Sequence, residues 1–279
     1  MNTRPKGRVF CLTYRLYLQF MLTVIGFLII FLATTAGSAM VYFFKHDIPK
    51  RTNAIILGFA AGVMIAASVW SLLIPSIEVA ERQFGVWSWV PAAVGFLLGG
   101  LFLVLLDHVL PHFHVGTGHE EGPHMKVHKS TRLFLAVTIH NIPEGLAVGL
   151  AFGAAAVSGE PGSYYAALGL AIGMAIQNFP EGAAIALPMK VATRSKRKAF
   201  LFGMGSGAVE PIAAVVGYIL ASEVAVLHPW MLGFAAGAMI FVVAEDLIPD
   251  SNISEYPHAG TWGVMLGFVL MMVLDVALG

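Results

Sequence analysis

Residues 133–157 read LFLAVTIHNIPEGLAVGLAFGAAAV, an almost unbroken apolar stretch whose one acid is Glu144. At about 1.5 Å per residue, a helix of this length is long enough to cross a hydrocarbon core of roughly 30 Å. Seven further stretches have similar length and character, at 16–44, 52–77, 83–106, 163–189, 199–221, 224–244 and 256–274. The sequence therefore predicts eight membrane-spanning helices, numbered here as spans 1 to 8 in chain order.

The composition agrees with this interpretation and excludes a soluble monomer. The chain has 279 residues, of which 58% are hydrophobic and 11% charged, and its mean hydropathy is +0.80. Ordinary soluble domains carry about 25% charged residues, so too little charge is present to cover a folded surface. We expect an all-α integral membrane protein, with a single transmembrane domain over 1–279 and a short basic N-terminal tail over 1–17.

Charge and cysteine content limit the kinds of partner that the protein can bind. The 16 Lys and Arg residues balance the 16 Asp and Glu residues, which argues against nucleic-acid binding through phosphate charge. The single cysteine, Cys11, excludes an internal disulfide and a thiolate cluster. The expected partners are the lipid bilayer and, if a metal binds, ions held by nitrogen and oxygen. No cofactor is expected.

The orientation follows from the basic residues of the loops. Eleven Lys and Arg residues lie in the loops after spans 1, 3, 5 and 7, against five on the opposite side, four of which are in the tail. Because cytoplasmic loops are enriched in Lys and Arg, both termini are predicted to be extracytoplasmic, in a multi-pass protein of the cell (inner) membrane. The basic tail argues the other way, but the internal loops agree with one another.

A first repeat links spans 2 and 7. Residues 58–65 read GFAAGVMI and residues 233–240 read GFAAGAMI, and each copy is followed by Leu-Ile-Pro, ending at Pro75 and Pro249. Spans 2 and 7 run in opposite directions, so the match predicts an inverted repeat of spans 1–3 and 6–8 around spans 4–5, as in many secondary transporters. Close packing alone also selects Gly and Ala. The shared phenylalanine, methionine and proline favour the repeat.

A second repeat lies inside spans 4 and 5. Residues 139–145 read IHNIPEG and residues 176–182 read IQNFPEG. Each proline frees the carbonyl four residues earlier, at Ile139 and Ile176, from its helical hydrogen bond. Such carbonyls are costly in hydrocarbon and tolerable beside water or a cation.

Counting residues from the basic side places both motifs near the membrane midplane, at the level of Glu210 and Met64. Three carboxylates at one depth would repel one another, and a divalent cation removes that cost. Imidazole, carboxylate and amide ligands suit zinc and related transition metals. A lone Glu210 could instead be a packing hydrogen bonder or proton carrier, and Met64 could be core filling. The candidate metal residues are His140, Asn141, Glu144, Gln177, Asn178, Glu181, Glu210 and Met64.

These motifs resemble the ZIP (Zrt/Irt-like) family of divalent metal transporters, of the prokaryotic type. The resemblance rests on the two Asn-x-Pro-Glu-Gly motifs, on Glu210-Pro211 and on a histidine-bearing loop between spans 3 and 4, and it covers nearly the whole chain. It implies an elevator-type carrier, in which spans 1, 4, 5 and 6 slide against spans 2, 3, 7 and 8. It also implies zinc uptake into the cytoplasm, with iron, manganese or cadmium carried by some members.

The resemblance also assigns roles to residues. It implies a principal metal site at His140, Glu144, Gln177 and Glu181, a neighbouring site at Asn141, Asn178 and Glu210, and a pore-facing Met64. Two departures matter. Many members have His in place of Gln177, and some have Asp in place of Asn178, so whether one or two metals bind is left open.

A histidine-rich cytoplasmic loop is expected over 107–132, and neutral histidines of this kind bind transition metals weakly. Asp107 together with Glu245, Asp246 and Asp250, on the same side, could form a release site; ordinary interfacial polar residues are the alternative. The oligomeric state is open, with a homodimer considered. The loop histidines are His108, His112, His114, His119, His124 and His128.

Two other functions compete. An intramembrane metal-dependent hydrolase needs three firm ligands, a metal-bound water and a general base, and no His-Glu-x-x-His pattern occurs. A proton-coupled carrier of another solute would use the carboxylates as proton relays, but it leaves His140 and Met64 without a purpose. We therefore expect a carrier and no enzyme, with the metal as its substrate.

Acidification should slow metal uptake. Protonation of Glu144, Glu181 or His140 weakens metal binding, because metal ligands must be deprotonated. The check is the initial rate of zinc entry into proteoliposomes over a series of external pH values. A rate that rises steadily through acidification would contradict this expectation.

Overall fold

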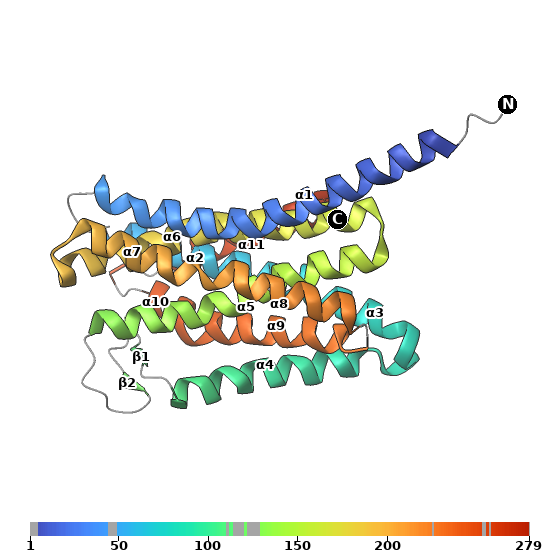
Figure 1. Ribbon diagram of the computed structural model, residues 1–279. Helices are drawn as coiled ribbons and strands as arrows, with labels where there is room; N and C mark the ends of the chain where they lie inside the picture. The colour runs from blue at the N-terminus through green and yellow to red at the C-terminus, as the bar shows by residue number, and fades with distance from the viewer. Residues whose placement is uncertain are drawn as a thin grey trace.

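The computed structural model describes residues 5–43, 49–109, 112–113, 120–121, 129–224, 226–252, 255–256 and 258–278. It contains eight helical segments that are long and apolar enough to cross a membrane, which confirms the predicted all-α membrane architecture. The helices lie side by side along one direction, and both ends of the chain lie at the same end of the bundle (Figure 1).

The first four spans contain the following elements: α1 (Pro5–Ser38) and η1 (Ala39–Tyr42); α2 (Lys50–Ala67), η2 (Ser68–Leu73) and α3 (Ile74–Phe84); α4 (Trp89–Val109), after the short turn η3 (Gly85–Trp87); and α5 (Lys129–Ser158). Between α4 and α5, the two-residue strands β1 (His112–Phe113) and β2 (Glu120–Glu121) pair in antiparallel fashion. The last four spans contain α6 (Pro161–Thr193); α7 (Lys196–Gly207) and α8 (Val209–Glu223); α9 (His228–Val242), η4 (Val243–Leu247) and α10 (Ile248–Ser251); and α11 (Ala259–Leu278).

Several boundaries differ from the predicted ones. The helix of span 1 begins at Pro5, inside the predicted tail. Span 2 continues past the expected end at Ile77 to Phe84, because a wide π-helical turn, η2, precedes Pro75 and lets the helix continue. In the second copy of the repeat, η4 precedes Pro249 in the same way. In that copy the distance along the chain from the first motif glycine to the proline is one residue shorter, and the π-turn is also one residue shorter.

Span 6, predicted as one helix, is interrupted at Ala208 between α7 and α8. Pro211 lies in the first turn of α8, where its missing N–H leaves no helical hydrogen bond unmade. The interruption places Glu210 at the amino-terminal end of α8, where the helix dipole favours a negative charge.

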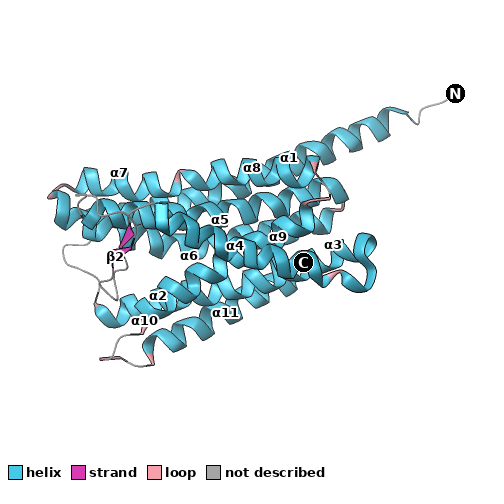
Figure 2. Ribbon diagram, turned by 90° about the horizontal axis from the view of Figure 1, so that it is seen from below, coloured by secondary structure: helices cyan, strands magenta, loops and turns pink. Residues whose placement is uncertain are grey.

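The helices pack as four close pairs in two groups. One group contains the pairs α1 with α6 and α5 with α8, together with α7; the other contains α2 with α11 and α4 with α9, together with α3 (Figures 1 and 2). The contacts between the groups are made mainly by α5 with α9 and by α6 with α2 and α11.

Glycines bring the paired helices to backbone contact. In both copies of the first repeat, a Cβ on either motif glycine would collide with the backbone of the partner helix. The collisions are Gly58 with Gly260 and Gly62 with Val264 across α2 and α11, and Gly233 with Ala92 and Gly237 with Phe96 across α9 and α4. The two copies thus make matching contacts, while the inverted relation between the two halves stays a prediction.

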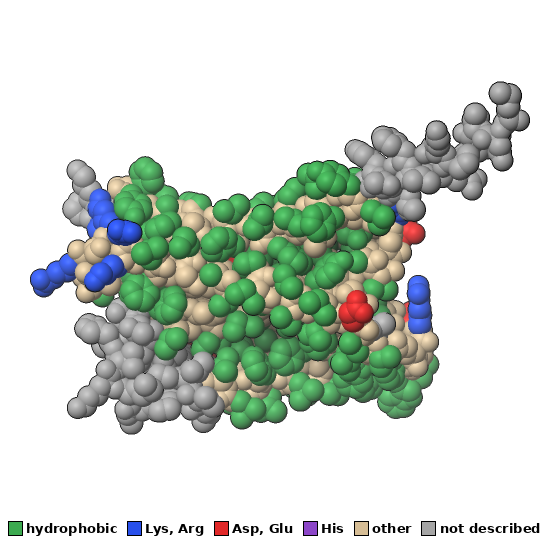
Figure 3. Space-filling view, viewed as in Figure 1, with side chains coloured by type: hydrophobic (Ala, Val, Ile, Leu, Met, Phe, Trp, Pro, Cys, Tyr) green, Lys and Arg blue, Asp and Glu red, His purple; other side chains and the backbone are tan. Residues whose placement is uncertain are grey.

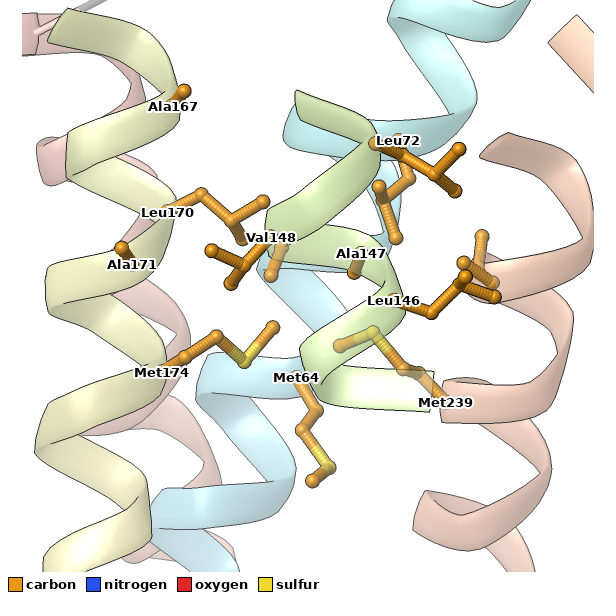
Figure 4. Close-up of a cluster of buried hydrophobic side chains, with 14 of the residues drawn as sticks. Met64, Leu72, Leu146, Ala147, Val148, Ala167, Leu170, Ala171, Met174 and Met239 are labelled. Atoms are coloured by element: carbon orange, nitrogen blue, oxygen red, sulfur yellow. The ribbon is translucent and has the colours of Figure 1, made fainter. Parts of the chain in front are cut away.

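An apolar core fills the seam between the two groups. Met64 of α2, Met174 of α6 and Met239 of α9 are buried around Leu146–Val148 of α5 (Figure 4). On the outer face, hydrophobic side chains cover the middle of the molecule, and Lys and Arg gather at the end where α6 meets α7 (Figure 3). This distribution is typical of a surface that contacts lipid in the middle and water at the ends.

Close packing at Gly62 should be essential for stability. A Cβ there would collide with the Val264 carbonyl, whereas at Gly100 on α4 the nearest atom would be Phe241 Cδ2 at 3.8 Å. We expect Gly62→Ala to destabilise the protein by about 1–3 kcal/mol through overpacking. Gly100→Ala should be neutral or stabilising by up to ~1 kcal/mol, because Ala favours helix. Thermal unfolding in detergent distinguishes the two variants, and equal melting temperatures would contradict the packing argument.

Candidate metal-transport site

Both Asn-x-Pro-Glu-Gly motifs lie inside unbroken helices, one in α5 and one in α6. His140 and Glu144 lie four residues apart in α5, as Gln177 and Glu181 do in α6, so each pair shares one helix face. Among these four, Glu144 and Gln177 are fully or almost fully buried. The side chains of Glu144 and Gln177 thus lie in the protein interior.

The carboxylate of Glu210 joins all four spans of that group. Its Oε1 accepts hydrogen bonds from Thr34 Oγ1 of α1 at 2.7 Å and from Asn141 Nδ2 of α5 at 3.3 Å. Its Oε2 accepts from Asn178 Nδ2 of α6 at 2.8 Å. Glu210 has no exposed surface, so these bonds replace the water that the carboxylate loses on burial.

The neighbouring amides direct their N–H groups into the protein. Asn141 Nδ2 also donates to the backbone carbonyl of Ser206 at 3.1 Å. Gln177 Nε2 donates to Asn178 Oδ1 at 2.7 Å and lies 3.8 Å from the thioether sulfur of Met174, a weak acceptor. These contacts use both amide hydrogens of Asn141 and one of those of Gln177.

Within the two motifs, five buried oxygens have no hydrogen-bond partner among the residues that the structure describes. They are Asn141 Oδ1, Glu144 Oε1 and Oε2, Gln177 Oε1 and Glu181 Oε1. Glu181 also experiences repulsion from Glu144 and Glu210. A buried acceptor left unsatisfied costs about 1–3 kcal/mol, and more if it is charged. All five atoms can accept hydrogen bonds or bind a cation, and none of them is a donor.

His140 connects the two sites that were predicted separately. Its Nε2 lies 3.3 Å from Asp246 Oδ2 in the π-turn η4, and both side chains are about one-sixth exposed, at 17% and 18%. Glu245, beside Asp246, is exposed. The structure thus joins a residue of the predicted principal site to one of the predicted release site.

Other predicted residues lie elsewhere or outside the description. Met64, 3% exposed, is buried in the apolar seam of Figure 4, in the same cluster as Met174. Asp250 lies in α10 and is partly buried. The side chains of Asp107, His108 and His112 and the residues His114, His119, His124 and His128 lie outside the described part of the chain.

Two contributors were missed by sequence reasoning. Thr34 donates to Glu210, and Ser206 accepts from Asn141 through its backbone carbonyl. Thr34 is one of few polar residues in an apolar span, which is the only sequence signal, and a backbone acceptor leaves none. Across the described ranges, no three His, Cys, Asp or Glu side chains converge closely enough to hold a metal ion by themselves. The amide oxygens therefore matter to any site here, and the ligand set stays a prediction.

Comparison with known proteins places the chain in a family. A family model described as "ZIP Zinc transporter" matches residues 130–275. Zinc transporter ZIP11 of Xenopus tropicalis is 38% identical over 92% of this chain and 97% of its own length. Zinc transporter GufA of Myxococcus xanthus is 36% identical over 88% and 94%, and zinc transporter ZIPB of Bordetella bronchiseptica is 37% identical over 88% and 78%. The chain, with its eight spans and its acceptor-rich centre, belongs to the ZIP zinc transporter family.

Proposed function

We propose that this protein carries zinc across the membrane, and that the five unpartnered oxygens of the first helix group bind the ion in transit. The supporting observation is that these oxygens are buried and lack donors within the described residues. Anionic and amide oxygens in a region without donors favour a cation over a solute that needs both donors and acceptors. The names of the similar proteins support zinc as that cation.

We propose Glu144, Glu181, Gln177 and Asn141 as the oxygen ligands, with His140 supplying nitrogen. This ligand set suits zinc, because imidazole nitrogen and carboxylate oxygen both bind zinc in proteins. Glu210 and Asn178, in contrast, already use their polar atoms in hydrogen bonds. These ligands together support the binding of one ion. Iron, manganese and cadmium share enough ligand chemistry to be candidate competitors.

The pairing of His140 with Asp246 supports an exit route. From the buried oxygens, an ion that follows His140 reaches Asp246 and then the exposed Glu245. We propose this sequence as the release path, with the Lys- and Arg-rich end of the molecule facing the cytoplasm of a cell-membrane protein and the termini outside. Transport then runs inward.

The division into two helix groups supports an elevator mechanism. The hydrogen bonds to Glu210 tie α1, α5, α6 and α8 into one unit that carries the site. Apart from the contact of His140 with Asp246, the seam with the other group is largely apolar and contains flexible methionine side chains, which repack easily. We propose that the first group moves against the second, and that the protein acts as a carrier without enzymatic activity.

Replacing Glu181 or His140 by Ala should strongly slow zinc entry. With zinc outside proteoliposomes and a fluorescent chelator inside, we expect native protein to import zinc and Glu181→Ala and His140→Ala to reduce the initial rate at least about tenfold, the loss that ~1.4 kcal/mol of ligand binding produces. Glu223→Ala, which removes an exposed carboxylate at the end of α8, is the matched control and should transport normally.

The result that would contradict the proposal is a native protein that binds zinc tightly but imports none in either orientation. That outcome would favour a retained metal and a hydrolytic role. Circular dichroism and gel filtration of each variant establish that a lost rate does not come from misfolding.

A further inference from the structure

We infer that Glu210 is a positioning residue, whose carboxylate orients the buried amides so that their oxygens face the transported cation. This inference rests on the proposed function, because it assigns the oxygens a cation to face. It concerns the direction of hydrogen bonds around Glu210, which neither the family match nor the names of the relatives address.

Both carboxylate oxygens of Glu210 accept hydrogen bonds in this structure. An amide, in contrast, can present either its N–H₂ group or its oxygen. Beside Glu210, Asn141 and Asn178 must therefore present nitrogen, as they do. The second hydrogen of Asn141 is taken by the Ser206 carbonyl. Its oxygen consequently points to the other side, where it has no hydrogen-bond partner among the described residues.

Asn178 in turn orients the amide of Gln177. Because Asn178 gives its nitrogen to Glu210, its oxygen is available to accept from Gln177 Nε2 at 2.7 Å. Gln177 therefore turns its own oxygen outward, and within the described residues that oxygen has no hydrogen-bond partner. Glu210, Asn178 and Gln177 thus form a relay of three side chains with one polarity. A neutral residue at position 210 that could donate as well as accept would leave this polarity undetermined.

The surroundings hold Glu210 in this role. Gly145 of α5 lies against the Glu210 backbone so closely that a Cβ would collide with it. A Cβ at Gly207 would lie 3.1 Å from Glu210 Oε1. With three donors on its two oxygens and no exposed surface, the carboxylate is fixed and largely saturated. A side chain in this state is better suited to orienting neighbours than to exchanging a metal ion.

The first test measures zinc affinity. Purified native protein, Glu210→Gln and Glu223→Gln are titrated with Zn²⁺ in detergent against a chelating dye. We expect Glu210→Gln to raise the dissociation constant at least about tenfold, because the amides lose their orientation. Glu223→Gln makes the same change at an exposed carboxylate at the end of the same helix and should leave the constant unchanged. Native affinity in Glu210→Gln, or an equal loss in Glu223→Gln, overturns the inference.

The second test reverses the direction of the hydrogen bonds in the relay and is made on the metal-free protein. In Gln177→Glu, Asn178 is flanked by two carboxylates and can give its nitrogen to only one, so we expect the melting temperature of the metal-free protein to fall. Adding Glu210→Gln keeps the total charge native and lets every bond of the relay run the other way. We expect this double variant to recover at least half of the loss. Additive effects of the two substitutions would overturn the relay.

The two tests separate this inference from the proposed function. A native protein that neither binds nor imports zinc refutes the proposed function, while the melting temperatures still decide on the relay. Zinc transport by native protein, combined with additive melting temperatures, refutes the relay alone. A Km-against-Vmax comparison in proteoliposomes adds a readout that a merely structural role does not predict: Glu210→Gln should raise Km for zinc more than it lowers Vmax.

Discussion

The carboxylate of Glu210 accepts hydrogen bonds from three other helices at a depth where the lipid offers no donor. Its burial requires Thr34, Asn141 and Asn178 to contribute their donors at that point. The donors that satisfy Glu210 are thereby used at that carboxylate. Buried oxygens of Glu144 and Gln177 have no hydrogen-bond partner among the described residues.

Two kinds of contact divide the work of holding the bundle together. Within a pair of helices, glycine brings backbone against backbone, as at Gly62 and Gly237. Membrane helices gain little from the hydrophobic effect, so such close approach is a main source of their attraction. Between the two groups, side chains such as Met64 and Met239 intervene. The hydrogen bonds around Glu210 lie within one group, whereas His140 reaches across the seam to Asp246.

The sequence predicted the spans well because apolar length is a local property. The grouping of Asn141, Glu144, Gln177 and Glu181 at one metal site was inferred from the equal depth of the two motifs and stays a prediction. The sequence did not predict which group donates and which accepts in each hydrogen bond. Thr34 and Glu210 are 176 positions apart, and their contact depends on how α1 packs beside α8. The pairing of His140 with Asp246 likewise depends on the contact between α5 and η4. The end of span 2 was misplaced because the apolar run stops at Glu78, whereas the helix continues to Phe84.

The glycine contacts have a mechanical consequence. Where two backbones touch, displacement along the helix axis would drive the bulk of neighbouring residues into the space that glycine leaves, so each pair resists shear. The seam lined by methionine and leucine has a layer of deformable side chains instead. The helix pairs should therefore resist sliding more strongly than the contact between the two groups does.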